Sequence, residues 1–189
     1  MTKNKDSLKN PAKSFFLIVL FSFCSIICKA QDIQQPSFQE AGCKQATVCF
    51  TPGGPCTNEI VNEINKAEKE VLVQAYSFTS APIAKALVKA RKRGLNVQVI
   101  LDKSQESERH SSLKLLAHAG VPTYIDRKHA IAHNKVIIID GQTLITGSFN
   151  FTKAAQENNA ENLLILRDTS LIPSYTQNWE FHKSHSDSI

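Results

Sequence analysis

Residues 133–150 have the sequence HNKVIIIDGQTLITGSFN, and their pattern decides the fold expected around them. The runs KVIIID and QTLITG have the length and apolar content of β-strands, and the Asp-Gly pair between them is typical of a tight hairpin turn. We therefore expect adjacent strands at residues 135–140 and 142–147. Polar residues precede the first strand and follow the second, so the two polar ends should meet at one edge of a sheet.

The spacing of these polar residues predicts that their side chains converge. His133 and Lys135 are two residues apart, as are Ser148 and Asn150, and residues two apart on a strand share a face. An imidazole, an ammonium, a hydroxyl and an amide together suit a phosphate group, because they supply one nucleophile and several hydrogen-bond donors. Each residue alone would more often be an ordinary surface residue, so the hypothesis of a phosphate site depends on their joint spacing.

Strand and helix patterns alternate along the rest of the chain. Strand patterns occupy residues 46–50, 71–78, 95–101, 121–125, 135–140, 142–147 and 161–166. Helical patterns occupy residues 57–70, 81–94, 111–120 and 170–182. This order predicts a single α/β domain over residues 46–185, with a mixed β-sheet flanked by helices on both faces. Trp179, in the last helix, is expected to anchor the core rather than to contact a ligand.

Residues 1–30 have the composition of a secretory signal peptide. Four lysines lie within residues 1–14, an apolar stretch follows at residues 15–27, and Ala30 precedes the expected cleavage point. A membrane anchor at residues 15–28 is the alternative, although it is shorter than the roughly 20 residues that a span needs. A lipoprotein at Cys28 is disfavoured by the bulky residue before it. We expect an exported protein, periplasmic or secreted, with residues 31–45 as a flexible arm and membrane contact only if the leader is kept.

The formal charge of +5 belongs mostly to this leader. Five of the 22 Lys and Arg residues and one of the 17 acidic residues lie in it, which leaves 17 basic and 16 acidic residues in a mature chain. A formal charge of +1 gives no general attraction for nucleic acid, so a local basic surface would have to supply it. The hydrophobic content of 42% is enough for a buried core and excludes a wholly disordered chain.

Three cysteines, Cys43, Cys49 and Cys56, lie outside the leader. Cys49 and Cys56 flank the turn TPGGP, so they are the expected disulfide pair in an exported protein, and Cys43 would be left over. A zinc site is the alternative, but three cysteines without a nearby histidine fit it poorly.

The stretch at residues 133–150 matches every defined position of the HxKxxxxDxxxxxxGSxN motif of the phospholipase D superfamily. The chain resembles more closely the small, exported bacterial endonucleases of that superfamily, which carry the motif once. The resemblance covers about residues 46–182 and includes AYSFTSAPIAKALVKARKRG, TGSFNFTKAAQ and NAEN. It implies the layered fold of that superfamily and hydrolysis of a phosphodiester bond.

The resemblance also implies roles for individual residues. His133 would be the nucleophile that attacks phosphorus and forms a phosphohistidine. Lys135 and Asn150 would bind the phosphate, and Ser148 occupies the position of the superfamily's site serine.

Two acidic residues complete the expected site. Glu161 corresponds to the superfamily's downstream acid, which implies that it orients the histidine as a carboxylate does in a catalytic triad. Asp140 matches the motif's aspartate, and its place at the far end of the strand gives it a supporting catalytic role without phosphate contact.

A single motif predicts that the site is incomplete in one chain. The superfamily's mechanism uses two histidines, one to attack and one to protonate the leaving oxygen, and no other histidine here begins an HxK sequence. We therefore expect a homodimer with one composite active site. Neither a cofactor nor a divalent metal is expected, because the histidine supplies the nucleophile and the sequence has no carboxylate cluster of the two-metal type.

Three functions remain open from the sequence: a nonspecific endonuclease on DNA, with RNA as a further substrate; a lipid-cleaving phospholipase D; and a non-catalytic nucleic-acid-binding module. The segment QENNAENLLIL also resembles a membrane-anchored, single-motif branch of the superfamily. Basic residues at 85–93 favour a solvated helix end slightly over a DNA contact, and the loop at residues 103–112 is expected to border the cleft.

Overall fold

The computed structural model describes residues 46–189, so the expected leader and arm, and with them Cys43, lie outside the described residues. Within this part of the chain, no helix is both long enough and apolar enough to cross a membrane.

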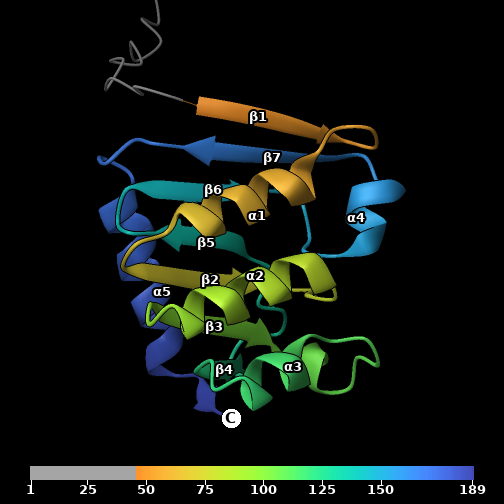
Figure 1. Ribbon diagram of the computed structural model, residues 1–189. Helices are drawn as coiled ribbons and strands as arrows, with labels where there is room; N and C mark the ends of the chain where they lie inside the picture. Colours follow the sequence, from red (N-terminus) through yellow and green to blue (C-terminus); the bar gives the residue numbers. More distant parts are fainter. Residues whose placement is uncertain (1–45) are drawn as a thin grey trace, which may run out of the picture. The chain divides into compact units, whose positions relative to one another are not determined.

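Eight strands form one mixed sheet, in the spatial order β1-β7-β6-β5-β2-β3-β4-β8 (Figure 1). They are β1 (Ala46–Thr51), β2 (Glu70–Ala75), β3 (Asn96–Asp102), β4 (Thr123–Asp126), β5 (Lys135–Ile139), β6 (Thr143–Gly147), β7 (Glu161–Leu166) and β8 (Asp187–Ser188). Strands β2, β3 and β4 are parallel to one another, and the other pairs are antiparallel. The hairpin expected at residues 135–147 is present as β5 and β6, with Ile138 opposite Leu144.

Helices cover both faces of the sheet, which confirms the expected α/β class. They are α1 (Cys56–Lys66), α2 (Ala81–Lys92), α3 (Leu113–His118), α4 (Lys153–Glu157) and α5 (Ile172–Ser184), with a 3-10 turn at Lys103–Glu106. Figure 1 shows α1, α2 and α3 in front of the sheet and α5 behind it. The central strands are buried on both faces, which is why β5 is a continuous apolar run rather than an alternating one.

Two apolar clusters hold the layers together. The larger lies between the sheet and the three helices in front of it, and the smaller lies beneath α5. Trp179 of α5 is fully buried in the smaller cluster, and its indole N–H donates to the carbonyl oxygen of Val73 at 2.9 Å. The expectation that Trp179 anchors the core is confirmed.

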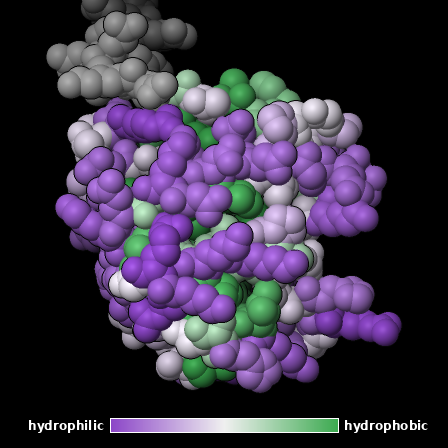
Figure 2. All heavy atoms as spheres, in the orientation of Figure 1, coloured by the Kyte–Doolittle hydropathy of each residue, from purple (hydrophilic) through white to green (hydrophobic). Residues whose placement is uncertain are grey.

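A disulfide links the edge strand to the first helix. Cys49 of β1 is bonded to Cys56, the first residue of α1, with their Cα atoms 5.6 Å apart. The other face of β1 is open, because Val48 and Phe50 are 53% and 63% exposed. Figure 2 shows hydrophobic atoms along the edge of the molecule where β1 lies, above a largely hydrophilic helical face.

Candidate active site

The expected site residues come from strand ends that meet at one end of the sheet. β2 ends where β5 begins, because Ala75 pairs with Lys135, and β6 ends beside the start of β7, because Gly147 pairs with Leu163. In Figure 1 this is the end nearest α4. Segments that are far apart in the sequence therefore contribute side chains to a single region.

His133 and Lys135 are neighbours in space, but not in the way the strand pattern predicted. Lys135 is the first residue of β5, as predicted, whereas His133 lies in the preceding loop, so strand alternation does not align the His133 side chain with that of Lys135. β5 cannot begin earlier because its partner β2 ends at Ala75. The Lys135 ammonium donates to the carbonyl oxygen of His133 at 2.6 Å, while the His133 side chain is exposed.

Tyr76 joins these two residues, and the sequence pattern did not single it out. Its ring centroid lies 4.5 Å from that of His133 and 5.1 Å from the Lys135 ammonium. Its backbone N–H donates to the carbonyl oxygen of Asn134, which fixes the loop that carries the histidine. Tyr76 is the first residue after a buried parallel strand, and ligands of α/β sheets bind at the carboxyl ends of such strands, so this position was the available signal.

Burial and a nearby negative charge shift the pKa of Lys135 in opposite directions. Only 7% of the residue is exposed, and this burial lowers the pKa of its ammonium below the ordinary 10.5, although the nearby Glu161 carboxylate raises it in part. An ammonium that has lost most of its water is stabilised by a negative group such as phosphate.

Ser148 and Glu161 form a second part of the site. The Ser148 hydroxyl donates to a Glu161 carboxylate oxygen at 2.6 Å, and the other oxygen accepts from the Asn159 amide at 3.0 Å. The Ser148 oxygen also accepts from the backbone N–H of Asn162. Among the described residues, the hydrogen-bond partners of the Glu161 side chain are Ser148 and Asn159. The expected contact that would orient His133 is therefore not made by Glu161 of the same chain.

Asn150 has a free buried amide atom. Its Oδ1 is buried and has no hydrogen-bond partner among the described residues. Buried polar atoms are nearly always paired, so the unpaired amide oxygen of Asn150 stands out at this end of the sheet. Asn150 lies at the same end of the sheet as Lys135, but Ser148 and Asn150 follow the end of β6, so the strand alternation expected for them does not apply.

Asp140 lies at the other end of the sheet and has a structural role. Its carboxylate accepts three backbone N–H groups, those of Glu68, Lys69 and Glu70, each at 2.8 Å. Burial alone would raise the pKa of Asp140, but these hydrogen bonds outweigh it and hold the pKa below the usual 3.8. Asp140 is five residues along the strand from Lys135, a distance of about 17 Å. It is therefore too far away to contact a phosphate bound at Lys135. This position agrees with the expected absence of phosphate contact, and the three hydrogen bonds show that Asp140 supports the structure.

Two further segments were singled out from the sequence, the loop at residues 103–112 and the basic residues at 85–93. The loop at residues 103–112 borders the site end, because Gln105 and Ser112 hydrogen-bond to the backbone of Phe78. The basic end of α2 lies at the opposite end of the sheet. There Arg91 and Arg93 donate to backbone carbonyl oxygens, including that of Ala67 at 2.8 Å, so these two side chains have a structural role.

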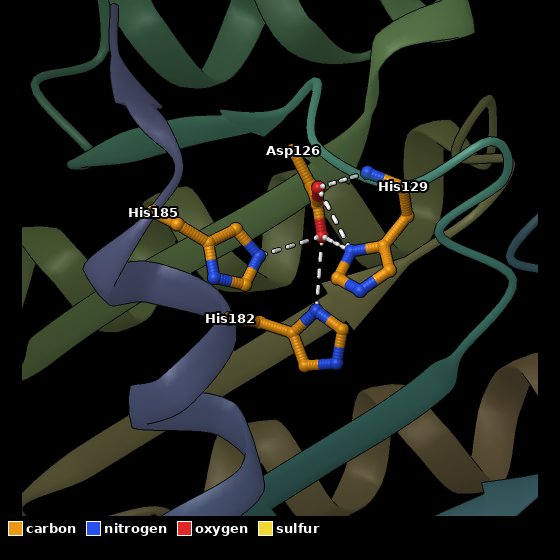
Figure 3. A group of neighbouring side chains, drawn as sticks. All are labelled: Asp126, His129, His182 and His185. Atoms are coloured by element: carbon orange, nitrogen blue, oxygen red, sulfur yellow. Dashed lines mark hydrogen bonds and ion pairs between the residues drawn. The ribbon is translucent and has the colours of Figure 1, made fainter.

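A separate polar cluster was missed by the sequence analysis. It consists of Asp126, His129, His182 and His185, which lie together at the end of β4 (Figure 3). The His-x-x-His spacing at residues 182–185, which places two imidazoles on one face of a helix, was the available signal. Nothing in the sequence indicated that this histidine pair would lie beside Asp126 of β4.

Comparison with known proteins relates this fold and site to characterised families. A family model described as "Cardiolipin synthase, PLD-like domain" matches residues 60–182. The chain is 44% identical to a phospholipase D of Rickettsia conorii over 160 residues, which is 85% of this chain and 80% of that protein. It is 28% identical to a mitochondrial cardiolipin hydrolase of Canis lupus familiaris over 163 residues, 86% of this chain and 64% of that one.

Two solved structures have the same fold. One is a phospholipase D family member, Nuc from Salmonella typhimurium, with a TM-score of 0.73 and 34% identity over 77% of this chain and 97% of that one. The other is NucT from Helicobacter pylori, with a TM-score of 0.68 and 26% identity over 77% of this chain and 100% of that one.

Proposed function

This chain belongs to the phospholipase D superfamily of phosphodiester-hydrolysing enzymes, and from that premise we propose that it is an endonuclease that needs no metal at the reacting phosphate. The observation that carries the proposal is the pairing of an exposed imidazole, His133, with a buried ammonium, Lys135, across the ring of Tyr76. The first supplies an accessible nucleophile and the second an electrostatic site for the charge on phosphate.

The proposed reaction has two steps. A ring nitrogen of His133 attacks phosphorus and forms an N–P bond, while the P–O bond to the leaving group breaks and the leaving oxygen takes a proton from the partner subunit's His133. The partner subunit's His133 then accepts a proton from water, the water oxygen attacks phosphorus, and the N–P bond breaks. His133 must be unprotonated to attack and its counterpart protonated to donate, so the two imidazoles carry one proton between them.

Lys135 is suited to hold the phosphate during both steps. An ammonium has three N–H donors, and one of them already binds the carbonyl oxygen of His133. This bond fixes the ammonium beside the nucleophile and leaves two donors for phosphate oxygens. Glu161 contributes through its charge on Lys135 and through Ser148, which makes it a positioning residue within this chain.

A second copy of the chain is proposed to complete the site. Ile131, two residues before His133, is 57% exposed, and an exposed apolar side chain beside a nucleophile is suited to burial against a partner. The exposed Val48 and Phe50 of β1 give a further apolar surface near the start of β7, where Glu161 lies. Both surfaces therefore border the half-site formed by one chain.

Nucleic acid is the proposed substrate because the site lies at the open end of the sheet and exposed basic residues lie on the segments that connect the strands. These residues are Lys103, Arg109, Lys128 and Lys153. They offer contacts to phosphates beyond the reacting one, without reading base sequence. The resemblance to exported single-motif endonucleases supports the same substrate and an exported location, with DNA first and RNA second.

Lipid phosphodiesters are the second candidate substrate, and the names of relatives favour them. The Rickettsia conorii relative is named a phospholipase D, and the dog relative a cardiolipin hydrolase.

One assay with three substrates tests the proposal. The purified protein is incubated with plasmid DNA, single-stranded RNA and liposomes of phosphatidylcholine and cardiolipin, each with and without EDTA. We expect DNA to be cut in EDTA by the unaltered protein and by His118→Ala, a change at an exposed helical position, but not by His133→Ala. Release of phosphatidic acid with DNA left intact would show that the protein is a phospholipase and not a nuclease. DNA binding without any cleavage would show that it is a binding module.

A further inference from the structure

Four potential metal ligands meet at the edge of the sheet, away from the phosphate-binding residues. Asp126 is the last residue of β4 and is fully buried, His129 follows in the next loop, and His182 and His185 lie at the end of α5. Each offers one nitrogen or oxygen atom, and these atoms all lie within 4.8 Å of one another. Figure 3 shows the three imidazoles arranged around the carboxylate of Asp126.

The two carboxylate oxygens of Asp126 have different hydrogen-bond partners. Oδ1 accepts the backbone N–H groups of Lys128 and His129 at 3.1 and 3.2 Å, which fixes the carboxylate in place. Oδ2 faces the imidazoles and lies 2.9 Å from His129 Nδ1, 2.9 Å from His182 Nδ1 and 3.4 Å from His185 Nε2. One fixed oxygen is thus surrounded by three ring nitrogens.

Three imidazoles crowd around this one carboxylate. Their ring centroids are 4.8, 5.2 and 5.4 Å apart in pairs. His185 Nδ1 is also buried and has no hydrogen-bond partner among the described residues. A metal ion held among the rings would account for three imidazoles that meet at one carboxylate.

We propose that Asp126, His129, His182 and His185 bind one divalent transition-metal ion, with Zn²⁺ as the ion that fits best. Three imidazole nitrogens and one carboxylate oxygen are a common tetrahedral ligand set for zinc, and four protein ligands make a closed, structural site. In such a tetrahedron the ligand atoms lie about 3.3 Å apart, given metal–ligand bonds of about 2.0 Å. The three Asp126–histidine distances lie close to this value, and all four ligand atoms lie within 4.8 Å of one another, so metal binding requires the imidazoles to turn toward a common centre.

The metal would join parts of the chain that are distant in sequence. Asp126 and His182 are 56 residues apart, and Asp126 and His185 are 59 apart. One ion would therefore hold the end of α5 against β4. His129 also lies in the loop between β4 and β5 that carries the nucleophile, His133, so the same ion would hold the first part of that loop. This role is structural and does not depend on which phosphodiester the enzyme cleaves.

Direct metal titration of the chelator-treated protein tests the proposal. We expect one equivalent of Zn²⁺ to bind by calorimetry and to raise the melting temperature. One equivalent of Co²⁺ should give the strong visible absorption of a tetrahedral site, and Zn²⁺ should displace it. Absence of stoichiometric binding of both ions to folded protein would overturn the proposal and leave the cluster as a network of hydrogen bonds.

Substitutions locate the site independently of activity. His182→Gln and His185→Gln should each raise the Kd for Zn²⁺ by more than about 100-fold, because loss of a ligand costs at least as much as loss of a group behind one. His118→Gln is the matched control, since His118 is exposed on α3 and should bind Zn²⁺ as the unaltered protein does. Unchanged affinity in both His182→Gln and His185→Gln, with circular dichroism showing a normal fold, would place the metal elsewhere and overturn the assignment.

Discussion

At the scale of the residue, the proposed site depends on Lys135, a lysine whose burial disfavours its charged form. Burial of Lys135 lowers the pKa of its ammonium below 10.5, and the Glu161 carboxylate partly opposes the shift. Since the phosphate needs the charged form, kcat/KM should fall on the alkaline side at a lower pH than an ordinary lysine would give. Glu161→Gln should move this alkaline limb to still lower pH, whereas Glu157→Gln, on an exposed residue, should not. A limb that does not move in Glu161→Gln would show that the charge of Glu161 does not act on Lys135.

Asp140 illustrates a motif residue whose effect is on stability. Its pKa is depressed by three backbone N–H groups, so its contribution is fully present above the unfolded value of 3.8 and is lost as the pH falls below it. Asp140→Asn should lower the free energy of unfolding at pH 7 by about 2 kcal/mol, and the difference from the unaltered protein should shrink in acid. Urea denaturation at pH 7 and pH 3 measures both values. An equal difference at the two pH values would exclude the proposed hydrogen-bonded carboxylate.

At the scale of the element, α5 is held by one large side chain on its buried face. Trp179 is fully buried and bonded to Val73, whereas Phe181 on the same helix is 55% exposed. Trp179→Ala should lower the free energy of unfolding by about 3–5 kcal/mol, and Phe181→Ala should change it far less. Equal losses in thermal or urea denaturation would contradict the packing of α5 described above.

The elements also show what the sequence could and could not predict. Hydrophobic runs and the Asp-Gly turn predicted β5, β6 and their pairing, because these features depend on residues close together in the chain. The start of β5 at Lys135 agrees with the prediction, but the orientation of His133 was not predictable, because His133 lies in the preceding loop, which is held by contacts such as that between Tyr76 and Asn134. Tyr76 and the Asp126 cluster depend on contacts between distant segments, so only their residue types were visible in advance.

At the scale of the whole molecule, the proposed active site needs two chains. Each chain supplies one His133, one Lys135 and one Asn150, and the apolar residues Ile131 and Phe50 remain exposed near them. Phe50→Glu and Ile131→Glu place a charge in the proposed interface and should each convert a dimer to a monomer with little activity. Light scattering with the DNA assay measures both properties. A fully active monomer in either case would remove the need for a partner.

The most direct test of a composite site is an assay of mixed subunits. Unaltered protein and His133→Ala are mixed in varying ratios, denatured and refolded together, and assayed on plasmid DNA at constant total protein. If each site needs one His133 from each of two chains, activity follows the square of the unaltered fraction, so an equal mixture retains about one quarter of full activity. Activity that falls in direct proportion to the unaltered fraction would contradict the shared site.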